Sequence, residues 1–158
     1  MATIHLSLIA QDRIVYEDDV KMVILPGASG AIGVLAKHAP LMAVLQPGEI
    51  LVRKDGEEDR YFSVGGGFAE VRPDEVVVLA RSAESADEID IARAEEAMRR
   101  AQEYLGSPEK DRDMEHRLAM EAALRRSLAR MKVARRRADV RSRSADQTPY
   151  RQAQQEEE

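Results

Sequence analysis

Two pairs of charged residues have the spacing of a helix face. Asp90 and Arg93 are three residues apart, and Arg126 and Arg130 are four apart. Guanidinium groups take phosphate oxygens in paired hydrogen bonds, and a carboxylate accepts from a ring or ribose group. If the two segments fold back on each other, the side chains converge on a ligand with a polyphosphate and a hydrogen-bonding ring. An interhelical salt-bridge network explains the same spacing.

The segment that must position these residues, 85–138, has helical periodicity. Ser85-Ala86-Asp87-Glu88 is a capping box, which predicts a helix start at Ser85. Gly106 ends this helix, and Pro108 lies in the first turn of the next. Apolar residues recur every three or four positions in both helices, at Ile91, Ala94, Met98, Ala101 and Leu105, then at Met120, Leu124, Leu128 and Met131. We therefore predict an antiparallel α-helical hairpin whose Ala- and Met-rich seam is thin. From 139 to 158 almost nothing is apolar, so we expect a disordered tail.

Residues 1–84 carry the signals of short strands. Alternating apolar residues begin at Ile4, and Asp55-Gly56 lies between two strand-like runs as a hairpin turn. A second turn contains Pro73, which fixes φ. About eight to ten strands this closely spaced predict an antiparallel β-sandwich, and the chain as a whole is α+β.

No catalytic or metal-binding constellation is present in the sequence. His5, His38 and His116 lack metal-ligand spacing, and there is no Cys. Neither a nucleophile elbow nor a Walker phosphate loop occurs. We interpret Gly65-Gly66-Gly67 as a tight bend between strands, because no helix follows it to bind phosphate. The sequence therefore predicts a non-catalytic protein that binds larger partners, with no metal and no obligatory cofactor.

Charge is distributed unevenly. Residues 125–158 carry 10 basic and 5 acidic side chains, while the stretches 1–86 and 87–124 are each net negative. The basic stretch from Arg125 to Arg143 is either a solvated helix face or an arm that docks on an acidic surface. No aromatic residue interleaves it, which argues against nucleic acid as the partner. No apolar run approaches the roughly 20 residues of a membrane span.

Several motifs in order resemble the epsilon subunit of the F-type ATP synthase. Gly30-Ala31-Ile32-Gly33-Val34-Leu35 with His38-Ala39-Pro40-Leu41 resembles that family's G-x-L-G and H-x-P-L loop. Gly66-Gly67-Phe68-Ala69-Glu70-Val71 resembles its G-G-F-x-E-V segment, and Ile89-Asp90 to Arg93-Ala94 matches I-D-x-x-R-A. This chain has Ala31 where members often carry an acidic residue, and Lys37 where they have Gly.

The resemblance implies a rotor subunit in the central stalk. In the family the sandwich binds the gamma subunit and the c-ring, with Ala31 and His38 here in the ring-facing loop. Its C-terminal helices fold against the sandwich or extend into the catalytic alpha/beta head and block ATP hydrolysis, a role that falls on Arg135, Arg136 and Arg137. Such a subunit lies at the cytoplasmic face of the bacterial membrane, peripherally, and contacts it only through the complex.

In some bacterial members the folded hairpin binds regulatory ATP. Carried over to this chain, the resemblance places that site at Glu84, Ile89, Asp90, Arg93, Ala94, Arg126 and Arg130. The alternative function from another class is a free-standing ATP-sensing module that needs no rotor.

Overall fold

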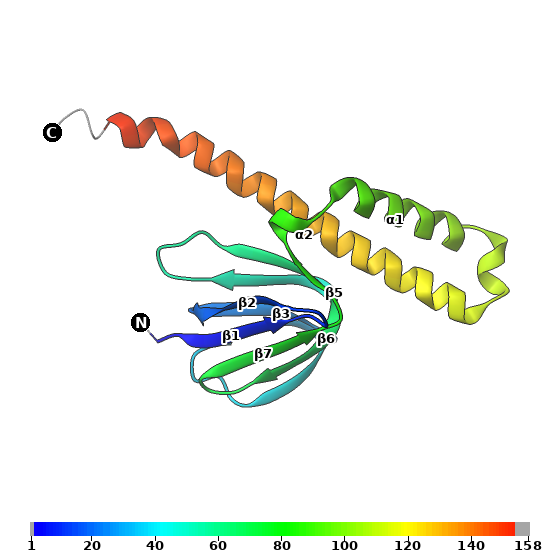
Figure 1. Cartoon of the computed structure of the whole chain (residues 1–158), viewed down its shortest axis with the longest axis horizontal. Coiled ribbons are helices and arrows are strands. Elements are labelled where there is room, and N and C mark those ends of the chain that lie inside the picture. The colour runs from blue at the N-terminus through cyan, green and yellow to red at the C-terminus, as the bar shows by residue number, and fades with distance from the viewer. Residues whose placement is uncertain (1, 154–158) are drawn as a thin grey trace.

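The computed structural model describes residues 2–153, and the side chains of residues 2–142. A β-sandwich is followed by an α-helical hairpin that lies against it (Figure 1), which confirms the predicted α+β fold class. The strands are β1 (Ile4–Ile9), β2 (Ile14–Val20), β3 (Met22–Gly27), β4 (Gly30–Leu35), β5 (Leu41–Arg53), β6 (Arg60–Val71), β7 (Glu75–Ala80) and β8 (Ala83–Ser85). The helical elements are the 3-10 turns η1 (Ala86–Glu88) and η2 (Pro108–Asp111), and the helices α1 (Ile91–Leu105) and α2 (Met114–Ala153).

The strand order is β2-β1-β7-β6-β5-β3-β4, and β8 pairs with β6. Both predicted hairpin turns are confirmed: Gly56 joins β5 to β6 at φ +76°, and the Arg72 N–H donates to the Glu75 carbonyl between β6 and β7. β1 and β7, however, pair in parallel rather than antiparallel. They are far apart in the sequence, so no tight turn forces an antiparallel direction on them.

β5 and β6 are long strands that cross from one layer of the sandwich to the other. The first half of β6 pairs with β8 and the second half with β7. Between the halves stand Gly66 and Gly67, at φ +90° and +144°, where a Cβ on Gly67 would collide with the Leu79 carbonyl. The glycine cluster is therefore a bend, as interpreted from the sequence, but it lies inside one strand.

The core of the sandwich is aliphatic. Its fully buried large side chains are Ile4, Leu6, Leu8, Val20, Val23, Leu25, Val34, Ile50, Val52, Val64, Val71 and Val76. These positions alternate along their strands, so the period-two pattern of the sequence places one set of side chains inside. Burial of this apolar surface is the main stabilisation of the sandwich.

The helices begin later than the sequence signals indicate. The Ser85 N–H donates to the Glu88 carboxylate, but this capping box closes only η1. Ile89 then adopts extended geometry and is buried against Val133 and Ala134, which interrupts the helix. α1 begins after Asp90, whose carboxylate accepts from the Arg93 N–H at 3.1 Å.

The second helix shows a similar delay and a longer extent. Pro108 starts only η2, and the Asp113 carboxylate accepts from the His116 N–H at the beginning of α2. α2 has 40 residues, hence a length of roughly 60 Å, and its C-terminal end projects past the sandwich (Figure 1).

α2 continues into the predicted tail as far as Ala153, because extending an existing helix needs no new nucleus. Disorder of residues 139–158 stays a prediction. Residues 154–158 lie outside the described residues. A domain boundary at residue 84 stays a prediction.

An ion pair links the sandwich to the start of the hairpin. Arg13, before β2, donates twice to Glu88 of η1, at 2.7 and 3.0 Å. This contact, with the Ser85 N–H, lowers the pKa of Glu88 from 4.5 to about 2. The stabilisation is therefore complete above pH 4.5 and disappears as the pH falls through about 2.

We expect Glu88→Gln to reduce the free energy of unfolding modestly, by about 0.5 kcal/mol at pH 7, because both side chains are partly exposed. In urea unfolding, the difference from the wild type should shrink steadily below pH 4.5. The Arg13→Gln variant should lower stability in the same direction and over the same pH range, and the double variant should cost little more than Glu88→Gln alone. A difference that is constant from pH 7 to pH 3 would contradict the assignment.

Candidate functional site

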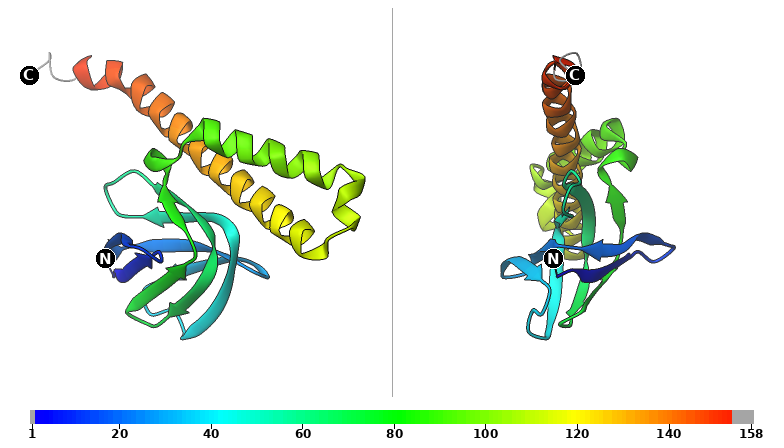
Figure 2. Two further views of the ribbon diagram at one scale, coloured as in Figure 1. Left: turned by 45° about the vertical axis from the view of Figure 1, so that its right-hand side comes forward. Right: turned by 90° about the vertical axis from the view of Figure 1, so that its left-hand side faces the viewer.

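α2 packs against both β5 and β6, and the hairpin lies on one side of the sandwich (Figure 2). At one end of this contact is Gly65, where an added Cβ would stand 3.3 Å from Cδ of Arg126. Tyr61 lies four residues before Gly65 on β6. The Arg136 guanidinium of α2 stacks over its ring, 5.4 Å from the ring centroid. The missing side chain at position 65 thus leaves room mainly for Ser82, whose Oγ an added Cβ would strike, and only secondarily for the Arg126 side chain of α2.

Two carboxylates face α2 from one row of the sheet. Glu49 on β5 is paired in register with Ser63 on β6, which is paired with Glu84 on β8. Glu84 accepts from Nε of Arg130 at 2.8 Å. Glu49 accepts from Nε of Arg136 at 3.3 Å, and Nζ of Lys132 lies 4.0 Å away. The carboxylate row therefore holds the basic side of α2 through three cations.

The predicted nucleotide residues are only partly brought together. α1 and α2 pack against each other, as the hairpin prediction requires. Glu84 and Arg130 are in direct contact, and Arg126 lies about one helical turn before them. Asp90 instead caps its own helix, and the Arg93 side chain is exposed. The Asp90 carboxylate thus has a structural role whether or not it meets a ligand.

The two apolar members of the nucleotide set are packing residues in this structure. Ala94 is 1% exposed in the seam between α1 and α2, beside the equally buried Ala101. Leu128 was predicted to lie in the apolar seam of the second helix, but it is 49% exposed. Its neighbour Ser127 is buried instead, and its hydroxyl donates to the Ala123 carbonyl. α2 must face both α1 and the sheet, so its buried side is shifted by one residue.

The three arginines of the predicted inhibitory stretch have different surroundings. Arg135 is exposed to solvent. Arg136 contacts Glu49 and Tyr61, and this contact with Glu49 raises the pKa of its guanidinium further. Nε of Arg137 lies 2.8 Å from the carboxylate of Asp87. Two of the three are therefore occupied by the chain's own β-sandwich and linker.

The predicted ring-facing residues lie on β4 and in the turn that follows it. Ala31 is exposed on β4, and His38 follows this strand with Nδ1 2.7 Å from the Ala39 carbonyl oxygen. Lys37 between them has φ +67°, the one positive φ among described non-glycine residues. This conformation costs a side chain about 1 kcal/mol, a cost that glycine avoids.

An apolar row crosses three strands on the exposed side of the sandwich. Val44 on β5 is paired with Phe68 on β6, which is paired with Leu79 on β7. Each is more than half exposed, at 56%, 55% and 55%, and Met42 beside them is 69% exposed. We call Met42, Val44, Phe68 and Leu79 the apolar row. Its strands were predicted, but the sequence does not say which side of each strand is outside.

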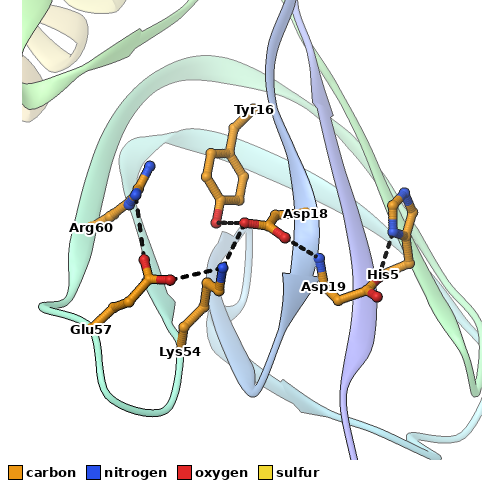
Figure 3. Close-up of polar contacts among 7 residues, drawn as sticks. All are labelled: His5, Tyr16, Asp18, Asp19, Lys54, Glu57 and Arg60. Carbon is orange, nitrogen blue, oxygen red and sulfur yellow. Dashed lines mark hydrogen bonds and ion pairs between the residues drawn. The ribbon is translucent and has the colours of Figure 1, made fainter.

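A charge network ties the β5–β6 turn to β2 (Figure 3). Lys54 Nζ bridges Asp18 at 2.7 Å and Glu57 at 2.9 Å, and it lowers the pKa of both carboxyls. Asp19 binds His5 on β1 at 2.8 Å. Asp18 and Asp19 are both in β2. These groups are satisfied by one another, so we assign the network to stability.

The fold and its surfaces together define a class of protein. It is a β-sandwich that carries an exposed apolar row and, at a separate surface, a docked helical hairpin with a basic second helix. Two family models match the chain. "ATP synthase, Delta/Epsilon chain, beta-sandwich domain" covers residues 3–86, and "ATP synthase, Delta/Epsilon chain, long alpha-helix domain" covers residues 87–135. The chain belongs to the delta/epsilon chain family of ATP synthase.

Curated relatives agree with this assignment. An ATP synthase epsilon chain of Dehalococcoides mccartyi is 48% identical over 139 residues, which is 87% of this chain and 96% of the relative. An epsilon chain of Chloroflexus aggregans is 43% identical over 131 residues, covering 83% and 91%. A chain in the Euglena gracilis mitochondrial ATP synthase structure (OSCP/F1/c-ring) has a TM-score of 0.72 at 28% identity, with 85% of this chain and 82% of that chain covered.

Within residues 2–153, no helix is long and apolar enough to cross a bilayer. No three His, Asp or Glu side chains within the described part of the chain gather in a group that could hold a metal ion.

Proposed function

We propose that this chain is a non-catalytic rotor subunit of the central stalk, which couples proton-driven rotation of the c-ring to ATP synthesis through the gamma subunit. It would act peripherally at the cytoplasmic face of the bacterial membrane, with membrane contact only through the complex. The Euglena neighbour belongs to an assembly that contains F1 and a c-ring, which supports these partners. Ala31 and His38 are our candidates for the contact with the ring.

The apolar row is the observation that carries the proposal. Monomeric proteins seldom expose several large apolar side chains side by side, and such a patch marks a protein interface. Val44, Phe68 and Leu79 stand in register on neighbouring strands, so they form one rigid surface. We assign the gamma subunit to this surface.

Phe68→Asp should weaken binding of the gamma subunit by at least roughly 30-fold, because a central aromatic side chain at an interface contributes about 2 kcal/mol or more. Binding is measured by titrating the purified chain into a gamma-containing subcomplex. Ile14→Asp is the matched control, since Ile14 is 59% exposed on β2, outside the row. Equal thermal unfolding of both variants would show that the sandwich is intact. Equal loss of binding in both would refute the assignment.

The hairpin is assigned the second part of the function, restraint of ATP hydrolysis by the catalytic alpha/beta head. Its basic stretch, with Arg135, Arg136 and Arg137, suits acidic surfaces of the head when α2 is released from the sandwich. The contacts of Arg136 and Arg137 with the β-sandwich and linker mean that release must come first.

Regulatory ATP is the third element of the proposal. Glu84, Ile89, Asp90, Arg93, Ala94, Arg126 and Arg130 would bind it on the folded hairpin, and the Glu84–Arg130 contact supports their shared location. A free-standing ATP-sensing module would use the same residues without a rotor. The apolar row favours the rotor, and co-purification with a gamma-containing complex distinguishes the two.

A further inference from the structure

Glu49 differs from the other carboxylates that hold α2 by its burial. Its side chain is 10% exposed, against 31% for Glu84 and 76% for Asp87. A carboxylate removed from water to this extent needs a charged or hydrogen-bonding partner. Among the described residues its charged partners, Lys132 and Arg136, both come from α2.

The two cations are four residues apart, on one side of the helix, and approach the carboxylate from successive turns. Arg136 is fixed further by the Tyr61 ring beneath it, at 5.4 Å. Next to these contacts Val133 is 0% exposed, packed with Ile89 and Ala134. The charged contact therefore borders the apolar contact between α2 and the rest of the fold.

We infer that Glu49, with Lys132 and Arg136, is a clamp that keeps α2 on the sandwich without any nucleotide. None of the three belongs to the residues assigned to ATP, and Arg136 lies almost two turns beyond Arg130. The folded hairpin thus has two separate points of attachment to the sheet row: Glu84–Arg130 beside the nucleotide residues, and the Glu49 clamp.

If the hairpin restrains hydrolysis as proposed, Arg136 has two mutually exclusive partners, Glu49 and an acidic surface of the catalytic head. While Glu49 holds the guanidinium, Arg136 is not free to meet an acidic surface of the catalytic head. Arg135, one residue away, is exposed in the same state. The clamp therefore acts as an intramolecular competitor of the head for one arginine of the inhibitory stretch.

The test uses amide hydrogen exchange of the purified full chain without nucleotide. Glu49→Gln should speed exchange of the α2 amides around residues 130–137 by roughly 3- to 10-fold, because an undocked helix is marginally stable. The amides of β6 should keep their wild-type rates. Arg136→Gln should speed the same amides, Arg135→Gln should have no effect, and the Glu49→Gln/Arg136→Gln double variant should show less than the sum of the two single effects, because both remove the Glu49–Arg136 contact.

Unchanged α2 exchange in Glu49→Gln overturns the clamp, as does an effect of Arg135→Gln equal to that of Arg136→Gln. If Glu49→Gln also loosens the sandwich, Arg136→Gln decides, since it alters only the helix side. The catalytic head is absent from this measurement. A failure of the chain to restrain hydrolysis would therefore refute that part of the proposed function and leave the clamp standing.

Discussion

Arg126→Gln should weaken ATP binding to the isolated chain by roughly 10- to 100-fold, the loss expected when a charge-assisted hydrogen bond to phosphate is removed. Titration calorimetry at millimolar ATP measures it. Arg126 lies beside Gly65 without an ion pair of its own among those the structure shows, so its replacement does not strand a partner. Arg125→Gln is the matched control, because it removes the same charge from an exposed neighbouring position.

To test whether the Asp90 carboxylate contacts ATP, a substitution other than alanine is needed. This carboxylate caps α1, so Asp90→Ala would destabilise the helix by about 1 kcal/mol even if ATP never binds. Asp90→Ser keeps a capping oxygen and removes the carboxylate. Weakened ATP binding in this variant, with unchanged helix content, would assign the carboxylate to the ligand. If titration of the wild-type chain with ATP released no binding heat, the ATP proposal would be refuted and the rotor function would be unaffected.

If ATP binds only the folded hairpin, it stabilises that state by about 1.4 kcal/mol for each tenfold excess over its dissociation constant. The Glu49 clamp adds a stabilisation that does not vary with ATP. The two together would set the fraction of chains that release α2 when the ATP concentration falls. The Glu49 clamp would set the fraction that stays docked without ATP.

Local signals predicted the elements of the fold well where each acts on its own neighbours. Gly56 and the Arg72–Glu75 turn need only a few residues to specify a hairpin, and both are as expected. The Ser85 capping box is equally local and is present, yet its helix stops after one turn. The burial of Ile89 against α2 decides this, and helix propensity does not carry information about such a distant contact.

Helical spacing placed Arg126 and Arg130 on one face of α2, but it did not show that this face meets the sheet, and it did not reveal Glu49. A single Glu after Pro47-Gly48 resembles a solvated turn residue, and only the register of β5 with β6 and β8 aligns it with Glu84. The apolar row was hidden for a related reason. In a sandwich with long bent strands, the outward positions change along one strand, so alternation alone does not separate core from interface.

Replacing Arg135, Arg136 and Arg137 together by Ala should relieve most of the restraint on ATP hydrolysis in the reconstituted complex and lessen its salt dependence, because three charges that face an acidic surface are lost.

The structure separates their contributions. Arg135→Ala removes an exposed charge with no contact in the folded state, so it should lower inhibition by weakening the extended state alone. Arg136→Ala weakens both the extended state and the clamp, and its effect should be smaller because the two losses oppose each other. Steady-state hydrolysis with each variant, at low and high salt, measures this order, and ATP synthesis should change less than hydrolysis. Unchanged hydrolysis in the triple variant would count against the arm.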